Sequence, residues 1–153
     1  MERKKYEFTG ETKVICGRTL NRIRALVSFV DVSSGDLGGW IEKESNLSLE
    51  GNAWVYGNAE VYGNAKVYGD AEVCGDACLM WISKIGSRND TITFTKTKNL
   101  KINVSVGCFK GDIDEFEKKV EKTHGENEHA KAYKLAIQLA KLRIDLSGGD
   151  KNE

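Results

Sequence analysis

The side chains of this chain best suited to proton transfer are its two histidines, His124 and His129. Histidine gains and loses a proton near neutral pH, so it can deprotonate a hydroxyl or amine acceptor. His124 precedes Gly125, where we expect a helix to end, and a cation at that position complements the helix dipole. His129 falls in the first turns of the next expected helix. We therefore interpret both as structural side chains and keep a catalytic general base as the alternative.

The four cysteines give no metal-binding pattern. Cys74 and Cys78 are separated by three residues, and no second paired motif accompanies them. A structural zinc site needs further ligands in a tetrahedral arrangement, which this spacing does not supply. The first residues, MERKKYEFTGE, lack the apolar core of a signal peptide. We therefore expect free thiols, no metal and no cofactor, in a cytoplasmic protein.

Aromatic side chains with cations near them are better candidates for binding a ligand. If subunits pack around a threefold axis, clefts between them could hold a small ligand beside these rings, with a lysine or arginine for an anionic group. The candidate cations are Arg88, Lys96 and Lys98, which come after the candidate rings in the sequence. The candidate ring positions are Trp40, Trp54, Tyr56, Tyr62 and Tyr68.

Most of these rings belong to a six-residue repeat, GNAWVY GNAEVY GNAKVY GDAEVC GDACLM, over residues 51–80. Each unit places alanine and valine two positions apart, which puts both on one face of a short strand. Glycine followed by Asn or Asp tolerates the positive φ of a tight corner. Because so short a strand cannot bury its apolar face alone, the repeat predicts stacked turns of a solenoid.

The repeat resembles the bacterial hexapeptide-repeat proteins. That resemblance implies a short left-handed parallel β-helix whose coil takes three hexads. It also implies a homotrimer, and acyl transfer from CoA with a histidine base, because many members of the family are acyltransferases. Both histidines lie outside the repeats here, and no long insertion interrupts the hexads, so the enzyme pattern is incomplete. With three hexads to a coil, the repeat tyrosines fall on different faces and form no single stacking ladder.

Continuing the register in both directions extends the repeat to residues 35–88, which would make about three coils. Equivalent residues of successive coils then stack in three inward columns. A lysine in one column predicts that the first coil splays there or that the amine reaches out to water. The columns are Leu37, Val55 and Val73; Leu49, Val67 and Ile85; and Lys43, Val61 and Leu79.

The segment before the repeat, residues 1–34, is expected to be an N-terminal β cap. Two β-leaning runs, residues 6–15 and 20–32, are separated by a turn around Gly17 and predict an antiparallel hairpin. Such a hairpin would cover the open edge of the first coil, which is otherwise a template for aggregation.

The segments after the repeat change character twice. Residues 89–110 alternate in polarity and predict a C-terminal β-hairpin with its turn at 97–99. Residues 111–146 predict two helices, and the first begins with Asp112 and Glu115 in capping-box spacing, carries Phe116 in its buried stripe and ends at Gly125. The second is expected over about residues 127–146. Residues 147–153 are expected to form a disordered tail, in what is otherwise one compact domain.

The last helix carries two apolar stripes, of which one can cover the hairpin or the end of the coil. The other stripe then needs a partner, which favours an oligomer, although a single wide face covered by the chain itself is the alternative. The first stripe consists of Tyr133, Ile137, Ala140 and Ile144. The second, expected at the oligomer interface, consists of Leu135, Leu139, Leu142 and Leu146.

Composition excludes two classes of partner. The 153 residues include 23 basic and 23 acidic side chains, so the net charge is zero and no broad surface for nucleic acid is expected. No apolar run approaches the roughly 20 residues that a membrane-spanning helix needs. We therefore expect no membrane partner.

A closer resemblance covers most of the chain. The sequences GDLGGWIEKESNLSLEGNAWVYGNAEVYGNA and GCFKGDIDEFEKKVEKTHG resemble small proteins of Firmicutes and their phages. The phage association leads to the hypothesis of a non-enzymatic binding module, a phage inhibitor of a host defence system that binds a host protein or sequesters a small nucleotide. The alternatives are a hexapeptide-repeat acyltransferase and a structural self-assembling protein.

Overall fold

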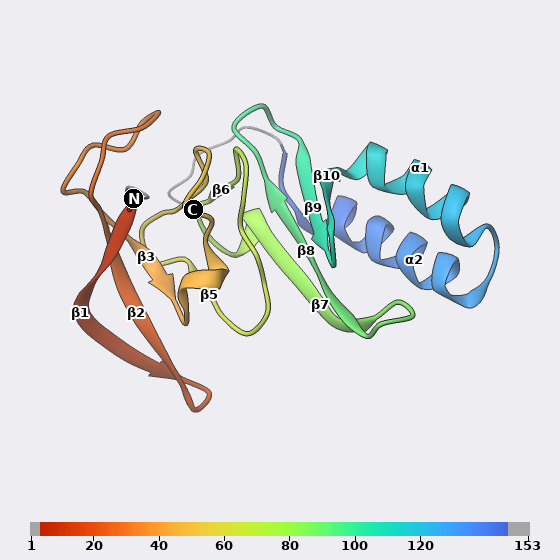
Figure 1. Cartoon of the computed structure of the whole chain (residues 1–153), viewed down its shortest axis with the longest axis horizontal. Coiled ribbons are helices and arrows are strands. Elements are labelled where there is room, and N and C mark those ends of the chain that lie inside the picture. The colour runs from red at the N-terminus through yellow and green to blue at the C-terminus, as the bar shows by residue number, and fades with distance from the viewer. Residues whose placement is uncertain (1–3, 147–153) are drawn as a thin grey trace. The chain divides into compact units, whose positions relative to one another are not determined.

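The structure is a computed structural model, and it describes residues 4–146. The chain divides into two compact units, residues 1–75 and 76–153, here called the N-terminal unit and the C-terminal unit. Strands predominate, and two α-helices follow them near the C-terminal end of the described residues (Figure 1). The predicted class, mainly β with two C-terminal helices, is confirmed.

A four-stranded sheet with the order β1-β2-β3-β5 organises the N-terminal unit. β1 (Tyr6–Ile15) and β2 (Arg18–Ala25) form an antiparallel hairpin, and β2 pairs antiparallel with β3 (Leu37–Ile41). β3 pairs parallel with β5 (Glu60–Val61). The first hairpin is therefore confirmed. Its two turn residues both have positive φ, which matches the twist of paired strands.

The second strand of this hairpin is shorter than predicted. Residues 26–36 leave the sheet as a loop, in which Phe29 and Val32 exchange backbone hydrogen bonds of 2.9 and 2.8 Å. Part of its apolar composition packs inward: Val32 is 4% exposed, and the Phe29 ring centroid lies 5.4 Å from that of Trp54. Leu26 and Val30 are exposed. The apolar residues that predict a strand in this segment therefore belong to a packed loop.

The alanines and valines of the repeat all point inward, as the alternation predicts. None of them is more than 6% exposed from Ala53 to Val73. Parallel pairing joins β4 (Trp54–Val55) to β6 (Glu72–Val73), and an isolated parallel bridge joins Leu47 to Val67. The described strand pairs do not close into a solenoid, so a left-handed β-helix is not shown.

The predicted inward columns are wrong in the first segment of the repeat. Leu37 and Leu49 are 54% and 38% exposed. β4 and β6 pair residues 18 apart, but Ile41 pairs with Val61 and Leu47 with Val67, both 20 apart. Ile41 therefore takes the inward position predicted for Lys43, and Leu47 takes that of Leu49.

The two extra residues lie between Ser48 and Asn52, because the Ser48 N–H donates to the Val67 carbonyl, 19 positions on, and the Asn52 N–H donates to the Gly69 carbonyl, 17 positions on. The corner before them is built on Asn46, which closes the short 3-10 helix η1 (Glu44–Asn46). The buried Asn46 amide accepts a hydrogen bond from the Lys43 backbone at 2.9 Å and donates to the carbonyls of Gly63 and Ala65 at 3.1 and 2.9 Å. Satisfying both ends of a buried amide fixes the corner. Lys43 itself is exposed, and its amine donates to the Asn64 side chain at 3.1 Å, as the outward alternative predicted.

The repeat also ends earlier than residue 88. The 3-10 helix η2 (Asp76–Cys78) leads into β7 (Leu79–Ile85), which pairs antiparallel with β8 (Asp90–Lys96). Leu79 and Ile85 are buried, but in this antiparallel pair and not in a third coil. No glycine occurs from residue 76 to residue 85, so the chain has no corner residue and continues as a strand.

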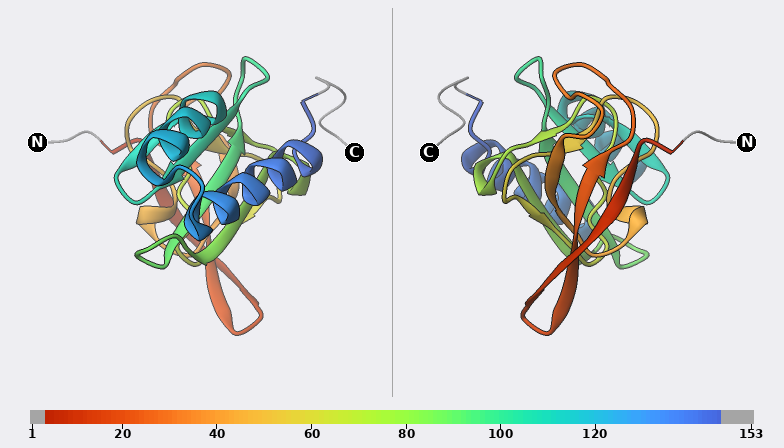
Figure 2. Two further views of the ribbon diagram at one scale, coloured as in Figure 1. Left: turned by 90° about the vertical axis from the view of Figure 1, so that its right-hand side faces the viewer. Right: turned by 90° about the vertical axis from the view of Figure 1, so that its left-hand side faces the viewer.

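The C-terminal unit is a four-stranded antiparallel sheet with the order β10-β9-β8-β7. The predicted hairpin is β8 with β9 (Ile102–Val106), and β10 (Phe109–Asp112) adds the edge strand. α1 (Ile113–His124) and α2 (Glu128–Arg143) pack on this sheet and share one hydrophobic core with it. Figure 2 shows both helices from two further directions.

Both helices begin as the sequence predicts, but α2 ends at Arg143, three residues before the predicted end at Leu146. The Asp112 carboxylate accepts from the Glu115 backbone at 2.8 Å, and the Glu115 side chain accepts from the Asp112 backbone at 3.2 Å, so the capping box is confirmed. Gly125 ends α1 with φ of 61°, and Asn127 caps α2 through Ala130 at 2.9 Å. The first predicted stripe of α2, from Tyr133 to Ile144, is buried.

The expectation of four free thiols is wrong for two of them. Cys74 and Cys78 are disulfide-bonded, whereas Cys16 and Cys108 are free and exposed. No helix within residues 4–146 is long and apolar enough to cross a membrane. The predicted disordered tail, residues 147–153, lies outside the described residues.

Candidate ligand-binding pocket

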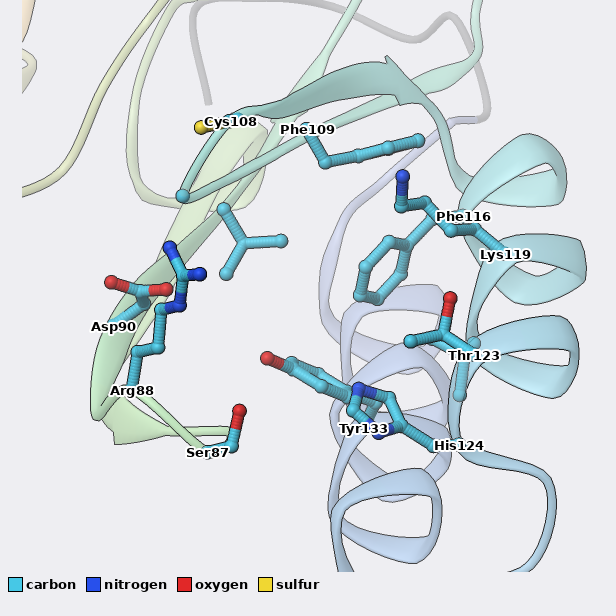
Figure 3. Close-up of a pocket in the computed structure, with 13 residues that line it drawn as sticks. Ser87, Arg88, Asp90, Cys108, Phe109, Phe116, Lys119, Thr123, His124 and Tyr133 are labelled. Carbon is cyan, nitrogen blue, oxygen red and sulfur yellow. The ribbon is translucent and has the colours of Figure 1, made fainter.

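A pocket of about 430 Å³ lies in the C-terminal unit, where two strand turns face α1 and α2 (Figure 3). The β7–β8 turn and the β9–β10 turn come at the same end of the antiparallel sheet, because β8–β9 turns at the other end. Each turn carries polar residues, and the helices supply the apolar wall. The pocket residues used below are Arg88, Asp90, Phe109, Phe116, Lys119, His124 and Tyr133.

Three aromatic rings line this pocket in contact with one another. The Phe116 ring centroid lies 5.2 Å from that of Phe109 and 5.2 Å from that of Tyr133, the latter in a T-shaped arrangement. Phe116 belongs to the buried stripe of α1, and Tyr133 to the buried stripe of α2. The amphipathic helices therefore fix the rings. Phe116 and Tyr133 are 4% and 8% exposed, so the half-buried Phe109 offers the largest ring surface on which a flat ligand can stack.

Tyr133 reaches from α2 to the β7–β8 turn. A Cβ built on Gly86 would collide with the Tyr133 hydroxyl and lie 2.9 Å from Cζ, so only glycine leaves room for this ring. Gly86 also has φ of +81°, a conformation that suits glycine. Burial, and then the negative charge of Asp90, raises the pKa of the Tyr133 hydroxyl, which therefore stays a neutral donor at physiological pH.

Two cations border the pocket from opposite walls. Arg88 comes from the β7–β8 turn and Lys119 from α1, as Figure 3 shows. The Lys119 amine lies 5.7 Å from the centroid of the Phe109 ring. Among residues 4–146, neither side chain makes an ion pair. Both charges are exposed and available to an anionic ligand.

His124, one of the two candidate general bases, also lines the pocket. Its ring centroid lies 5.8 Å from that of Tyr133 and 5.7 Å from that of His129. His129 packs against His124 and is not among the residues that line the pocket. Both histidines are half-buried. Within the described part of the chain, no carboxylate or carbonyl holds the His124 ring in the way that a general base is usually oriented.

Of the three cations predicted to hold an anion, only Arg88 lies at the pocket. Lys96 and Lys98 are at the opposite end of β8, which spans seven residues or about 20 Å. Lys96 is buried and Lys98 is exposed in the β8–β9 turn. The alternation of the hairpin was predicted correctly, but strand length separates these lysines from Arg88.

The two predicted tryptophans lie in the N-terminal unit and serve its packing. Trp54 is 1% exposed and meets the edge of the Tyr6 ring at a centroid distance of 6.3 Å. Trp40 is 6% exposed, with the Lys13 amine 4.4 Å and the Arg22 guanidinium 5.3 Å from its ring centroid. Neither side chain is the outward-facing ring that the repeat predicts.

The three repeat tyrosines are half-buried. Arg18 lies 5.6 Å from the Tyr62 ring centroid. Burial, together with the charges of Glu72 and Asp31, raises the pKa of Tyr56 to about 12. Tyr68 occupies the equivalent repeat position. These rings have structural surroundings, and they do not belong to the pocket of the C-terminal unit.

The second stripe of α2 remains largely exposed. Leu135, Leu139 and Leu142 are 67%, 43% and 81% exposed. Leu146 departs from the prediction, because it is half-buried and packs against the core of the C-terminal unit.

Sequence reasoning missed most of the pocket. Phe116 and Tyr133 were recognised only as core residues, and Asp90, Phe109 and Lys119 were not singled out. A signal was present in the glycines at 86 and 107, which mark two hairpin turns at the same end of one sheet. Among the described residues, no group of three or more His, Cys, Asp or Glu side chains is placed to hold a metal ion.

Comparison with known proteins does not add a family to these observations. No protein-family model matches the chain, and no curated protein is significantly similar to it. Conclusions about function therefore rest on the pocket itself.

Proposed function

We propose that this protein is a non-enzymatic binding module whose C-terminal pocket takes a small anionic ligand with a flat ring, of the nucleotide class. The observation that carries the proposal is the combination in one pocket of three contacting rings with two cations that make no ion pair among the described residues. A volume of about 430 Å³ lies within the range of pockets that hold small molecules.

The chemistry of the lining matches both parts of such a ligand. A base stacked on an aromatic side chain gains roughly 1–3 kcal/mol. A phosphate can accept charge-assisted hydrogen bonds from arginine or lysine, and these are about twice as strong as neutral ones. Arg88 and Lys119 outnumber the single carboxylate of the pocket, Asp90, so a ligand with net negative charge is preferred.

The resemblance to phage proteins supports a biological setting for such binding. A small module that sequesters a nucleotide signal would inhibit a host defence system without catalysis, and binding of a host protein is the other form of this proposal. Within the same proposal, the parallel pairs of the N-terminal unit belong to a short left-handed β-helix. The exposed stripe of α2 at Leu135, Leu139 and Leu142 forms the contact of a homotrimer.

Binding can be tested by isothermal titration calorimetry with GMP, AMP, CMP, UMP and inorganic phosphate. We expect at least one mononucleotide to bind more tightly than phosphate. The double variant Arg88→Ala/Lys119→Ala should weaken that binding at least tenfold. Lys98→Ala, which removes an exposed lysine at the other end of β8, is the matched control and should bind normally. The proposal fails if no nucleotide binds, or if the control variant loses as much affinity as the double variant.

One observation favours the alternative of a CoA-dependent acyltransferase: His124 lines the pocket, and its ring centroid lies 5.8 Å from that of Tyr133. In that case acetyl-CoA should raise the melting temperature, and His124→Ala should abolish acyl transfer to a hydroxyl or amine acceptor. Turnover that depends on His124 would replace the binding-module proposal. A thermal shift with acetyl-CoA but no turnover would instead identify CoA as a bound nucleotide.

A further inference from the structure

Asp90 is the one carboxylate among the residues that line the pocket. It begins β8, directly after the β7–β8 turn, and its backbone is paired with Ile85. Its side chain is half-buried against Gly107, where a Cβ would lie 3.1 Å from Oδ2. A glycine with φ of +55° in the β9–β10 turn therefore makes room for this carboxylate at the pocket.

No residue from 4 to 146 donates a hydrogen bond to the Asp90 carboxylate. The carboxylate is nevertheless close enough to the ring of Tyr133 for its charge to contribute to the raised pKa of that hydroxyl. A carboxylate can only accept hydrogen bonds. When a ligand displaces water from a half-buried carboxylate, it must supply N–H or O–H donors, because an unpaired buried charge is costly.

From this arrangement we infer that the pocket selects a guanine nucleotide, with Asp90 accepting from the N–H edge of the base. This inference rests on the proposed nucleotide-binding function and names the base. Guanine presents two adjacent donors, at N1 and N2, and a carboxylate can accept from both at once. Adenine and cytosine present one exocyclic amino group beside a ring acceptor, which the carboxylate cannot satisfy.

The neighbour of Asp90 on the same turn fits the same base. Figure 3 shows Arg88 and Asp90 on one wall and Lys119 on the other. Guanine carries the O6 acceptor beside N1, so a donor next to the carboxylate complements its edge, and arginine is a common partner of guanine O6. With Asp90 and Arg88 at the base, Lys119 is the cation left for the phosphate.

A ligand with an ammonium group, such as an amino acid, would also satisfy Asp90. Its zwitterion carries no net negative charge, whereas the pocket offers two cations and one carboxylate. Three contacting rings also exceed what one amino-acid side chain can cover. The lining therefore favours the nucleotide over the amino acid.

The test compares GMP, IMP and AMP by isothermal titration calorimetry on the full chain. IMP has the guanine ring system, O6 and N1–H, but lacks the N2 amino group. We expect GMP to bind at least tenfold more tightly than IMP or AMP. In Asp90→Asn, which can accept from only one of the two donors, the ratio of GMP to IMP affinity should fall to about one. Asp114→Asn removes the same charge from an exposed position on α1 and should keep the wild-type ratio.

The possible results distinguish the guanine inference from the proposed nucleotide-binding function. If nucleotides bind but the wild-type protein does not discriminate GMP from IMP, the guanine inference is wrong and nucleotide binding stands. Discrimination that survives in Asp90→Asn overturns the role of Asp90. Failure of these three nucleotides, and of CMP and UMP, to bind overturns the proposed function as well. The ratio of GMP to IMP affinity in the wild-type protein tests the guanine inference even if Asp90→Asn does not fold.

Discussion

Glycine serves different ends in the two units. In the repeat of the N-terminal unit, Gly57 has φ of +56°, and a Cβ added there would meet nothing within 4 Å. In the C-terminal unit, Gly86 also has positive φ, but a Cβ would collide with the Tyr133 ring at the pocket. The first glycine bends the chain and the second makes room for a side chain. Regular spacing thus indicates packing, whereas the irregular turn shapes the site.

Charged side chains differ between the units in the same way. In the N-terminal unit Lys13 pairs with Glu60 at 2.6 Å and Arg18 with Glu42 at 2.8 Å. At the pocket of the C-terminal unit, Arg88 and Lys119 make no ion pair with any described residue. The paired cations therefore contribute to structure, whereas the proposed function assigns ligand binding to the two cations that border the pocket. The proposed binding site therefore lies in the C-terminal unit, outside the repeat.

The largest expected effect tests the packing of the repeat. Val61 is fully buried beside Ile41. Val61→Asp places a carboxylate in this apolar contact, and we expect it to lower the free energy of unfolding of the N-terminal unit by more than about 4 kcal/mol. Urea denaturation followed by tryptophan fluorescence measures the loss.

The matched control is Leu37→Asp, which makes the same chemical change at a residue that is 54% exposed. We expect a change within about 0.5 kcal/mol, as for most surface substitutions. Equal losses at both positions would restore the register with 18 residues throughout and contradict the pairing of Ile41 with Val61.

This register shows where sequence reasoning succeeded and where it stopped. The inward alternation of Ala and Val could be predicted from the sequence because it is local, with a period of two residues. The change in pairing from 20 residues to 18 falls between Ser48 and Asn52, whose backbone N–H groups donate to the carbonyls of Val67 and Gly69. The hexad spacing favours Leu49 over Leu47 as the inward residue and gives no sign of an insertion, although Leu47 is the buried one, so the inward residues of the first segment are predicted wrongly.

The site was harder to predict for a related reason. The capping box at Asp112 and the buried stripe containing Phe116 follow from local spacing, and both were correct. The pocket arises only when turns about 20 residues apart in sequence come to one end of a sheet and face two helices. The sequence predicts Arg88 as an anion contact. Asp90 and Lys119 become pocket residues only because the folded chain brings the turns and α1 together, which local spacing does not predict.

The next effect is a pH dependence specific to the N-terminal unit. Lys5 is 4% exposed, and burial lowers its pKa from 10.5 to about 8. Between pH 8 and 10 the unfolded lysine therefore binds more protons than the folded one, so stability rises with pH, by about 2 kcal/mol. Denaturation midpoints across this range measure the rise, and Lys5→Met should flatten it.

Tyr6 limits the pH range over which stability rises. Burial, and then the charge of Glu44, raises the pKa of its hydroxyl well above the ordinary value of 10. The folded tyrosine keeps its proton where the unfolded one loses it, so stability falls as the pH rises above about 10. A stability that falls steadily from pH 8 to 10 in the wild-type protein would contradict the buried position of Lys5.

A smaller effect distinguishes the two kinds of glycine. Gly86→Ala strains a left-handed backbone and displaces Tyr133, so we expect it to cost about 2 kcal/mol and to weaken nucleotide binding severalfold. Gly57→Ala has the strain alone and should cost about 1 kcal/mol with binding unchanged. Calorimetric titration together with thermal unfolding of both variants separates the two results. Equal loss of binding in both would mean that the pocket does not depend on the placement of Tyr133.

Substitutions of the exposed leucines of α2 are expected to change stability least and oligomeric state most. Leu135 and Leu142 are 67% and 81% exposed, so Leu135→Glu/Leu142→Glu should change stability by no more than about 0.5 kcal/mol. If this stripe joins subunits, the same variant should convert the trimer to monomers in sedimentation velocity, because charges would be buried at the contact. Val14→Glu, at an equally exposed residue of β1, is the control in the other unit. Dissociation by Val14→Glu alone would move the contact to the first hairpin, and a monomeric wild-type protein would overturn the trimer altogether.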